Sequence, residues 1–146
     1  MVGARSLPLL RSAAFVLLCM TASLCSARDV RKVVIEEVGQ SLPDGDPRTA
    51  ELCKKFRPTV TQVKNFFSKI YPVQARMVLH DYYSPCYATG TVVFEDNSSG
   101  AWSLYSGGTA ALVWTHGGDK VYVYYGKNKW YDPFACTYGL EDEGKC

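Results

Sequence analysis

The chain has 146 residues, of which 47% are hydrophobic, 13% aromatic and 21% charged, a composition typical of one globular domain. Loss of an N-terminal export segment would remove Arg5 and Arg11 from the 16 Lys and Arg, leaving 14 against 14 Asp and Glu, so the mature chain would be neutral. A neutral domain lacks the positive field that attracts nucleic acid or an anionic membrane surface, so both partner classes are disfavoured.

The N-terminal residues have the pattern of an export signal. Basic residues precede an apolar run over residues 12–24, and a triplet of small residues ending at Ala27 follows it. We therefore expect cleavage after Ala27, which divides the chain into a signal peptide over residues 1–27 and a single domain over residues 28–146. The apolar run is too short to span about 30 Å of hydrocarbon as a helix. The mature protein is expected to be soluble and to reside in the periplasm or outside the cell.

The mature chain begins with a predicted strand and a first helix. Valine and isoleucine recur among charged residues over residues 28–38, which suits a short strand added to one edge of a sheet. A loop rich in turn-forming residues follows over residues 39–46. Asp46 has the character of a helix N-cap with Pro47 at the first helical position, and Pro58 ends this helix.

A second helix is predicted directly after the first. Thr59 and Gln62 have the spacing of a capping box, and apolar residues then recur at intervals of three and four. The predicted helix covers residues 59–71 and stops at Pro72. Its apolar stripe includes two phenylalanines, and burial of each would contribute on the order of 1.5 to 3 kcal/mol.

Strands account for most of the remaining chain. Side chains alternate over residues 75–83, which predicts a strand that Pro85 ends. From residue 88 to residue 126, three turns rich in Gly, Asn, Asp and Ser separate four alternating runs, the pattern of sequential antiparallel hairpins. These runs cover residues 88–95, 101–105, 109–115 and 120–125.

The alternation also assigns the two faces of the predicted sheet. An apolar face should pack under the helices, and a face carrying Tyr, Thr and Ser should meet water. The expected fold class is α+β, with two N-terminal helices packed on one face of an antiparallel β-meander of four to six strands, stapled by disulfides. The apolar face is assigned to Val92, Phe94, Trp102, Leu104, Leu112 and Trp114, and the other face to Thr91, Ser103, Tyr105, Val113 and Thr115.

Four cysteines remain after the predicted cleavage, Cys53, Cys86, Cys136 and Cys146. Two disulfides are expected because the export compartment is oxidising, and four cysteines allow three pairings. The preferred pairing joins Cys53 to Cys86, which would fasten the helical part to the sheet, and Cys136 to Cys146, which would close the tail. The spacings match no zinc pattern, so no metal site is expected, and no cofactor motif is present.

Residues 84–94 carry a resemblance to known proteins. Their sequence, Ser-Pro-Cys-Tyr-Ala-Thr-Gly-Thr-Val-Val-Phe, resembles an SPCYAxGTVxF-like segment of small exported bacterial proteins that have a helical N-terminal part. The resemblance implies a bacterial periplasmic origin and a shared fold, and it transfers no functional residue. In size and build the domain is also similar to the periplasmic immunity proteins that neutralise secreted antibacterial effectors, without a shared motif.

One catalytic hypothesis uses Cys86 as a nucleophile with His80 and Asp81, as in a cysteine hydrolase acting on cell-wall peptide. A catalytic cysteine needs a thiolate favoured by a helix N-terminus or a neighbouring histidine. Cys86 instead precedes a predicted strand and lies next to Pro85, in a chain with three other exported cysteines. We therefore expect a disulfide cysteine, a structural histidine and no enzyme activity.

Five aromatic residues exceed what a domain of this size needs inside, namely Tyr105, Tyr122, Tyr124, Trp130 and Tyr131. Tyr and Trp anchor protein interfaces, although they also suit strands and can pack internally. The preferred hypothesis is a non-catalytic exported binding protein that occludes a protein partner, in concrete terms an immunity protein or inhibitor of a secreted toxin or hydrolase. The alternatives are the cysteine hydrolase and a glycan-binding module.

Overall fold

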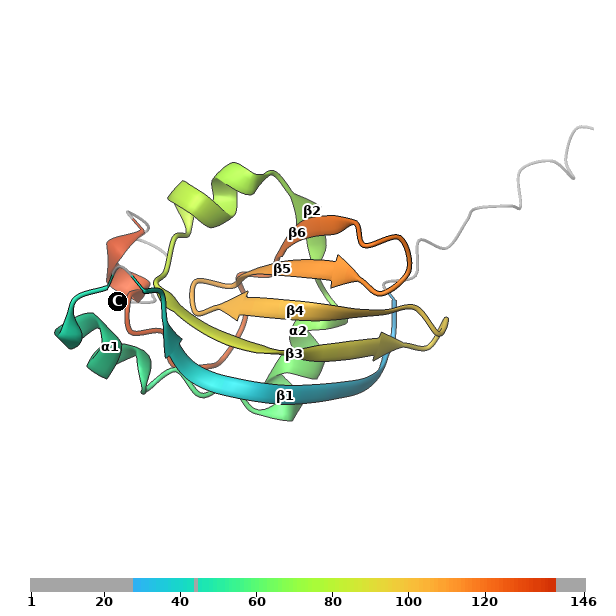
Figure 1. Cartoon of the computed structure of the whole chain (residues 1–146), viewed down its shortest axis with the longest axis horizontal. Coiled ribbons are helices and arrows are strands. Elements are labelled where there is room, and N and C mark those ends of the chain that lie inside the picture. Colours follow the sequence, from blue (N-terminus) through green and yellow to red (C-terminus); the bar gives the residue numbers. More distant parts are fainter. Residues whose placement is uncertain (1–27, 44, 139–146) are drawn as a thin grey trace, which may run out of the picture.

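The computed structural model describes residues 28–43 and 45–138 (Figure 1). The chain is α+β, as predicted, and the expected signal peptide over residues 1–27 lies outside the described residues. In chain order the elements are β1 (Val30–Ser41), α1 (Pro47–Cys53), α2 (Val60–Phe67), β2 (Tyr71–Val73), the π-helix η1 (Met77–Asp81), β3 (Cys86–Phe94), β4 (Ser99–Tyr105), β5 (Thr109–Trp114), β6 (Lys120–Tyr124) and the 3₁₀ helix η2 (Ala135–Thr137).

The strands form one six-stranded antiparallel sheet in the order β1-β3-β4-β5-β6-β2. The four strands from β3 to β6 each pair with their neighbour in sequence, because short turns connect them. The long strand β1 pairs with β3 at one edge, with three shifts in register. At the other edge, β2 pairs with β6 through only three residues. In Figure 1, α2 lies behind the sheet and α1 lies at its left end.

The apolar face of the sheet forms the core together with α2. Trp102 of β4 pairs with Leu112 of β5, Val92 of β3 pairs with Gly100 two residues before Trp102, and all three side chains are at most 2% exposed. Phe67 of α2 packs against Trp102 with ring centroids 5.7 Å apart, and Phe66 is fully buried beside it. The face predicted to be apolar is therefore the buried face, with only Trp114 at its edge partly exposed.

Both predicted helix starts are confirmed. The Asp46 carboxylate accepts hydrogen bonds from the backbone N–H groups of Arg48 and Thr49, at 2.7 and 2.9 Å. At α2 the Thr59 hydroxyl accepts from the Gln62 N–H at 3.2 Å, and the Gln62 side chain accepts from the Thr59 N–H at 2.9 Å. Both caps satisfy N–H groups that have no partner within the helix, so each helix begins where the sequence predicts.

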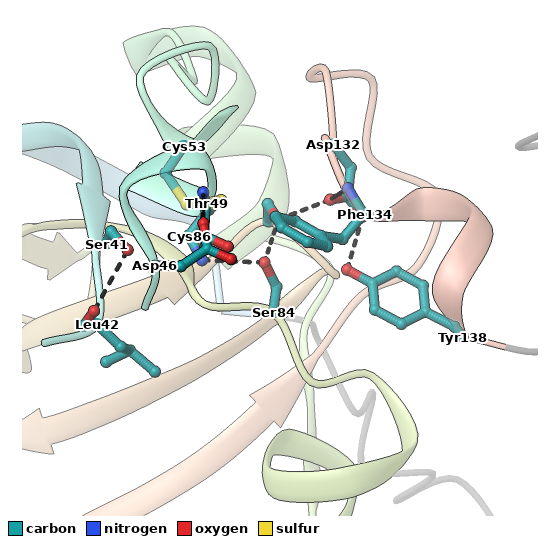
Figure 2. Close-up of a disulfide and its surroundings, with 11 residues drawn as sticks. Ser41, Leu42, Asp46, Thr49, Cys53, Ser84, Cys86, Asp132, Phe134 and Tyr138 are labelled. Carbon is teal, nitrogen blue, oxygen red and sulfur yellow. Dashed lines mark hydrogen bonds between the residues drawn. A yellow bond between two sulfur atoms is a disulfide. The ribbon is translucent and has the colours of Figure 1, made fainter. Parts of the chain in front are cut away.

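A disulfide joins Cys53 at the end of α1 to Cys86 at the start of β3, which confirms this predicted pairing (Figure 2). Both residues are 0% exposed. Cys136 is also disulfide-bonded, and its predicted partner Cys146 lies outside the described residues. The bond between Cys53 and Cys86 fastens the helical part of the chain to the sheet.

The predicted end of the second helix and the predicted strand over residues 75–83 are wrong. The second helix ends at Phe67 and not at Tyr71, since Tyr71 already pairs with Tyr124 in the sheet. The strand predicted over residues 75–83 is the π-helix η1, in which the Tyr82 N–H donates to the Met77 carbonyl at 2.9 Å. Because β2 occupies the edge of β6, a strand over residues 75–83 could not pair with β6 there.

Candidate binding surface

One face of the sheet is left uncovered by α1 and α2, and we call it the open face (Figure 1). It carries the side chains that alternate with the buried ones on β3 to β6. They are mostly uncharged and many bear hydroxyl groups. The open face comprises Tyr87, Thr89, Thr91, Ala101, Ser103, Tyr105, Ala111, Val113, Lys120 and Tyr122, with Val34 and Glu36 of β1 at its edge.

A shallow hollow of about 400 Å³ lies at the centre of the open face. It arises because short side chains meet there: Thr89 pairs with Ser103, and Ser103 pairs with Ala111. Taller side chains flank this row, among them Tyr105, which pairs with Tyr87 at a ring-centroid distance of 6.3 Å. The sheet thus presents a depression with an aromatic wall.

The hollow is charged only at its two ends. Among its lining residues, the only ionisable side chains that are charged at neutral pH are Glu36 on β1 and Lys120 on β6, from opposite edges of the hollow. The Lys120 ammonium lies 5.3 Å from the centroid of the Tyr122 ring, within cation–π range. The arrangement gives an uncharged floor between a negative end and a positive end.

Tyr105 is a group of the hollow with a raised pKa. Burial raises the pKa of its hydroxyl, and the nearby Lys120 ammonium partly opposes that shift. Its ordinary pKa is about 10, so the hydroxyl remains protonated at neutral pH. Tyr105 is therefore a neutral ring with a hydrogen-bond donor at the edge of the hollow.

The structure separates the five aromatic residues predicted to bind a partner. Tyr105 and Tyr122 are half-buried on the open face, and Tyr131 is 59% exposed outside the hollow. Tyr124 and Trp130 are only 9% and 7% exposed, so little of either side chain is accessible to a partner.

Each of the two buried rings has a packing reason. The Tyr124 ring lies between Tyr71, at 5.7 Å, and Tyr82, which η1 brings to 4.7 Å. Trp130 folds back onto the helix side, where its ring contacts Phe56 and Phe66. Alternation along a strand cannot predict the ring contacts of Tyr124 or of Trp130, because the contacting rings come from segments distant in the sequence.

The cysteine-hydrolase alternative has no free nucleophile at Cys86. The Sγ atom of Cys86 is bonded to Cys53 and fully buried, so no thiolate is present at this position. His80 and Asp81 lie exposed on η1, where Asp81 forms an ion pair with Arg76 at 3.6 Å. The three residues therefore do not form a nucleophile, base and orienting acid.

A polar cluster that sequence reasoning missed lies beside the disulfide (Figure 2). The hydroxyls of Ser84 and Ser106 are 2.6 Å apart, and Ser106 donates to the Asp132 carboxylate at 2.6 Å. Tyr138 and the Phe134 N–H also donate to that carboxylate, at 2.8 and 2.9 Å. Asp132 thus accepts three hydrogen bonds, which suits an anchor for the C-terminal segment. Serine in Gly-rich turns is a common turn former, so the sequence offers no signal for this cluster.

The described part of the chain has neither a metal-binding cluster nor a membrane-spanning helix. No group of three or more His, Cys, Asp or Glu side chains there is placed to hold a metal ion. No described helix is long and apolar enough to cross a membrane.

Comparison of the chain with protein-family models, with curated proteins and with solved structures found no match. The resemblance of residues 84–94 to small exported bacterial proteins therefore stays a prediction.

Proposed function

We propose that the protein is a non-catalytic exported binding protein whose open face binds a protein partner. The observation that carries the proposal is the uncovered, tyrosine-walled hollow, charged only at Glu36 and Lys120. Interface cores are enriched in tyrosine and depleted of charge, whereas charged groups gather at the rim. The hollow has this distribution.

The exposed apolar side chains of the open face support the same proposal. Val34 and Val113 are each 39% exposed, and both belong to one row across the sheet that also contains Thr91 and Ala101. Burial of such a row by a partner would remove apolar surface from water, which is the main source of association energy. The hollow at the centre of the open face would admit a protruding loop or strand of the partner.

The concrete role that we propose is inhibition. The compartment would be the periplasm or the exterior, since the Cys53–Cys86 disulfide persists in oxidising compartments. A small disulfide-bonded domain with a rigid sheet can occlude the active site of a secreted toxin or hydrolase without chemistry of its own. In this role the protein would act as an immunity protein for the cell that exports it.

A glycan-binding role is the second candidate. Hydroxyl groups of Thr89, Ser103 and Tyr105 line the hollow, and sugars are recognised through such groups and through tyrosine rings. A glycan would bind the same face, so the experiment has to distinguish the two partner classes.

The experiment compares variants of the two sides of the domain. Tyr105→Ala and Val113→Asp alter the open face, and Val60→Asp places the same charge on α2 at a residue that is 51% exposed. Each purified variant is used to capture partners from periplasmic and secreted fractions, and the captured partner's affinity and hydrolytic activity are then measured. We expect at least about tenfold weaker binding for the two open-face variants, as for interface anchors, and no change for Val60→Asp.

The outcomes separate the alternatives. Inhibition of the captured protein that is lost with Tyr105→Ala supports the inhibitor role. Equal weakening by Val60→Asp would contradict the assignment of the face. Binding of peptidoglycan fragments that Tyr105→Ala abolishes, with no captured protein, would replace the protein partner with a glycan.

A further inference from the structure

A second, apolar pocket of about 360 Å³ lies on the helix side of the sheet, opposite the open face. Its inner wall consists of Phe67, Phe94 and Leu112, each at most 1% exposed. Ile70, Trp114 and Val121 line its outer part and are only partly buried. The pocket is therefore an extension of the core that reaches the surface.

The pocket exists because the helical cover is short. Helix α2 ends at Phe67, and the chain then leaves toward β2, which pairs with only three residues of β6. Among the helices of residues 28–43 and 45–138, none covers the inner face of β5 and β6 beyond that point, at Trp114 and Val121. A concave apolar site of this size falls within the range of roughly 300 to 1,000 Å³ of small-molecule pockets.

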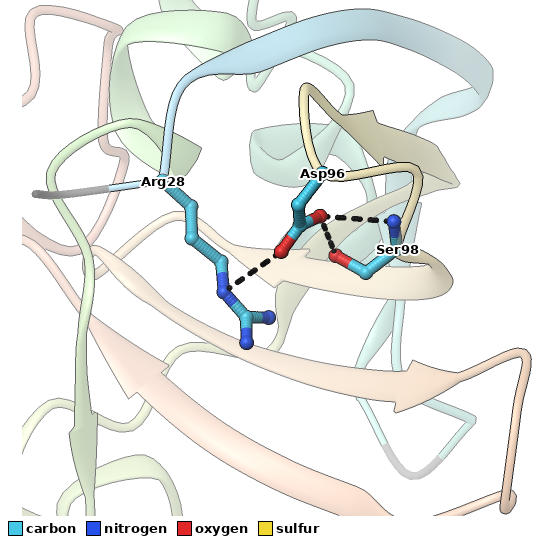
Figure 3. Close-up of polar contacts among 3 residues, drawn as sticks. All are labelled: Arg28, Asp96 and Ser98. Atoms are coloured by element: carbon cyan, nitrogen blue, oxygen red, sulfur yellow. Dashed lines mark hydrogen bonds and ion pairs between the residues drawn. The ribbon is translucent and has the colours of Figure 1, made fainter.

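Among the described residues that line this pocket, Arg28 supplies the one charged side chain. Its guanidinium carbon lies 5.1 Å from the centroid of the Trp114 ring, and its Nε atom lies 3.4 Å from the Asp96 carboxylate (Figure 3). The Asp96 carboxylate is itself held by the N–H of Ser98 at 2.9 Å and by the Ser98 hydroxyl. Ser98 thus holds Asp96, and Asp96 pairs with the Arg28 side chain, which is 54% exposed.

This arrangement leaves the terminal nitrogens of Arg28 available. The ion pair with Asp96 is made through Nε, and Figure 3 shows the guanidinium beside the Asp96 carboxylate. Within the described residues, the ion pair of Arg28 with Asp96 is formed through Nε and not through an Nη atom. Two adjacent Nη atoms of a fixed guanidinium form a fork that matches the two oxygens of a carboxylate.

We propose that this pocket binds a small amphiphilic carboxylic acid, with its apolar body against Phe94, Leu112 and Trp114 and its carboxylate on the Nη atoms of Arg28. Asp96 is a positioning residue, since it touches Arg28 and not the ligand. A volume of about 360 Å³ has room for about twelve groups of water's size, at about 30 Å³ each. A straight-chain acid such as octanoate has a body of this scale.

The test is isothermal titration calorimetry of the full chain with octanoate and with 1-octanol, which has the same chain without the carboxylate. We expect saturable octanoate binding that is at least about tenfold tighter than octanol binding, because hydrogen bonds to charged groups are strong. Arg28→Ala should reduce octanoate affinity to that of octanol. Arg28→Lys should bind more weakly than the native protein, because an ammonium lacks the fork.

Two further variants make the assignment specific. Arg31→Ala removes an exposed arginine of β1 that does not line the pocket, and it should leave octanoate affinity unchanged. Asp96→Asn should weaken octanoate binding and leave octanol binding unchanged, which a merely destabilised pocket would not do. Absence of octanoate binding, equal affinity for octanol, or equal effects of Arg28→Ala and Arg31→Ala would overturn the proposal. The open-face proposal is independent of each of these results.

Discussion

Ser106 links three parts of the chain through one side chain and one carbonyl. Its hydroxyl has a single proton, which goes to the Asp132 carboxylate, so the Ser84 hydroxyl must donate to Ser106. The Ser106 carbonyl also accepts from the indole N–H of Trp130 at 2.9 Å. The turn after β4, the entrance to β3 and the aromatic segment are thereby held together.

We expect Ser106→Ala to lower the free energy of unfolding by about 1 to 3 kcal/mol, because it leaves buried hydrogen-bonding groups without a partner. Ser103→Ala is the matched control, since Ser103 lies on the open face and not in the cluster. It should change stability by less than about 0.5 kcal/mol. Urea unfolding of both variants measures the difference, and similar losses would contradict the role of the cluster.

Asp96 gives a pH dependence with a definite sign. Hydrogen bonds from Ser98 hold the pKa of this carboxyl below its ordinary value. A carboxyl whose pKa is lowered on folding contributes stability above its unfolded pKa, and that contribution is lost as the pH falls through the lowered folded pKa. Asp96→Asn should therefore be less stable than the native protein near about pH 7 and should approach it near about pH 2. Urea midpoints at the two pH values test this, with Asp119→Asn as an exposed control; a constant difference would contradict it.

At the scale of elements, the sequence predicted those features whose interactions join residues close together in the chain. The caps at Asp46 and Thr59 were predictable because their hydrogen bonds lie within four residues. The π-helix η1 was not, because its conformation depends on which segment occupies the free edge of β6. The occupant, β2, has only three residues, too few for alternation to mark a strand.

The disulfide between α1 and β3 should be a major source of stability. We expect the double variant Cys53→Ala with Cys86→Ala to lose about 3 to 4 kcal/mol of unfolding free energy, because the bond closes a loop with a sequence separation of 33 residues. Urea unfolding without reductant measures the loss. The native protein should show no reactive thiol at Cys86, and labelling of that residue under denaturing, non-reducing conditions would contradict the pairing.

At the scale of the whole molecule, the sheet separates two chemically different sides. The helix side holds the core and the apolar pocket at Arg28, and the other side is the open face with its uncharged hollow. The partial burial of Tyr105 and Tyr122 on the open face was predictable from alternation within single strands. The charged ends at Glu36 and Lys120 were not, because they are brought to one hollow by the pairing of β1 with β3 and of β5 with β6.

Site-directed photo-crosslinking tests the central claim, that the open face binds a protein partner. A photoreactive residue at position 103 would lie in the hollow. One at position 64 would lie on the exposed side of α2. Mixed with periplasmic and secreted fractions, the protein labelled at position 103 should yield a discrete protein adduct that Tyr105→Ala abolishes, and the protein labelled at position 64 should not. The same adduct from position 64, or none from position 103, would contradict the claim.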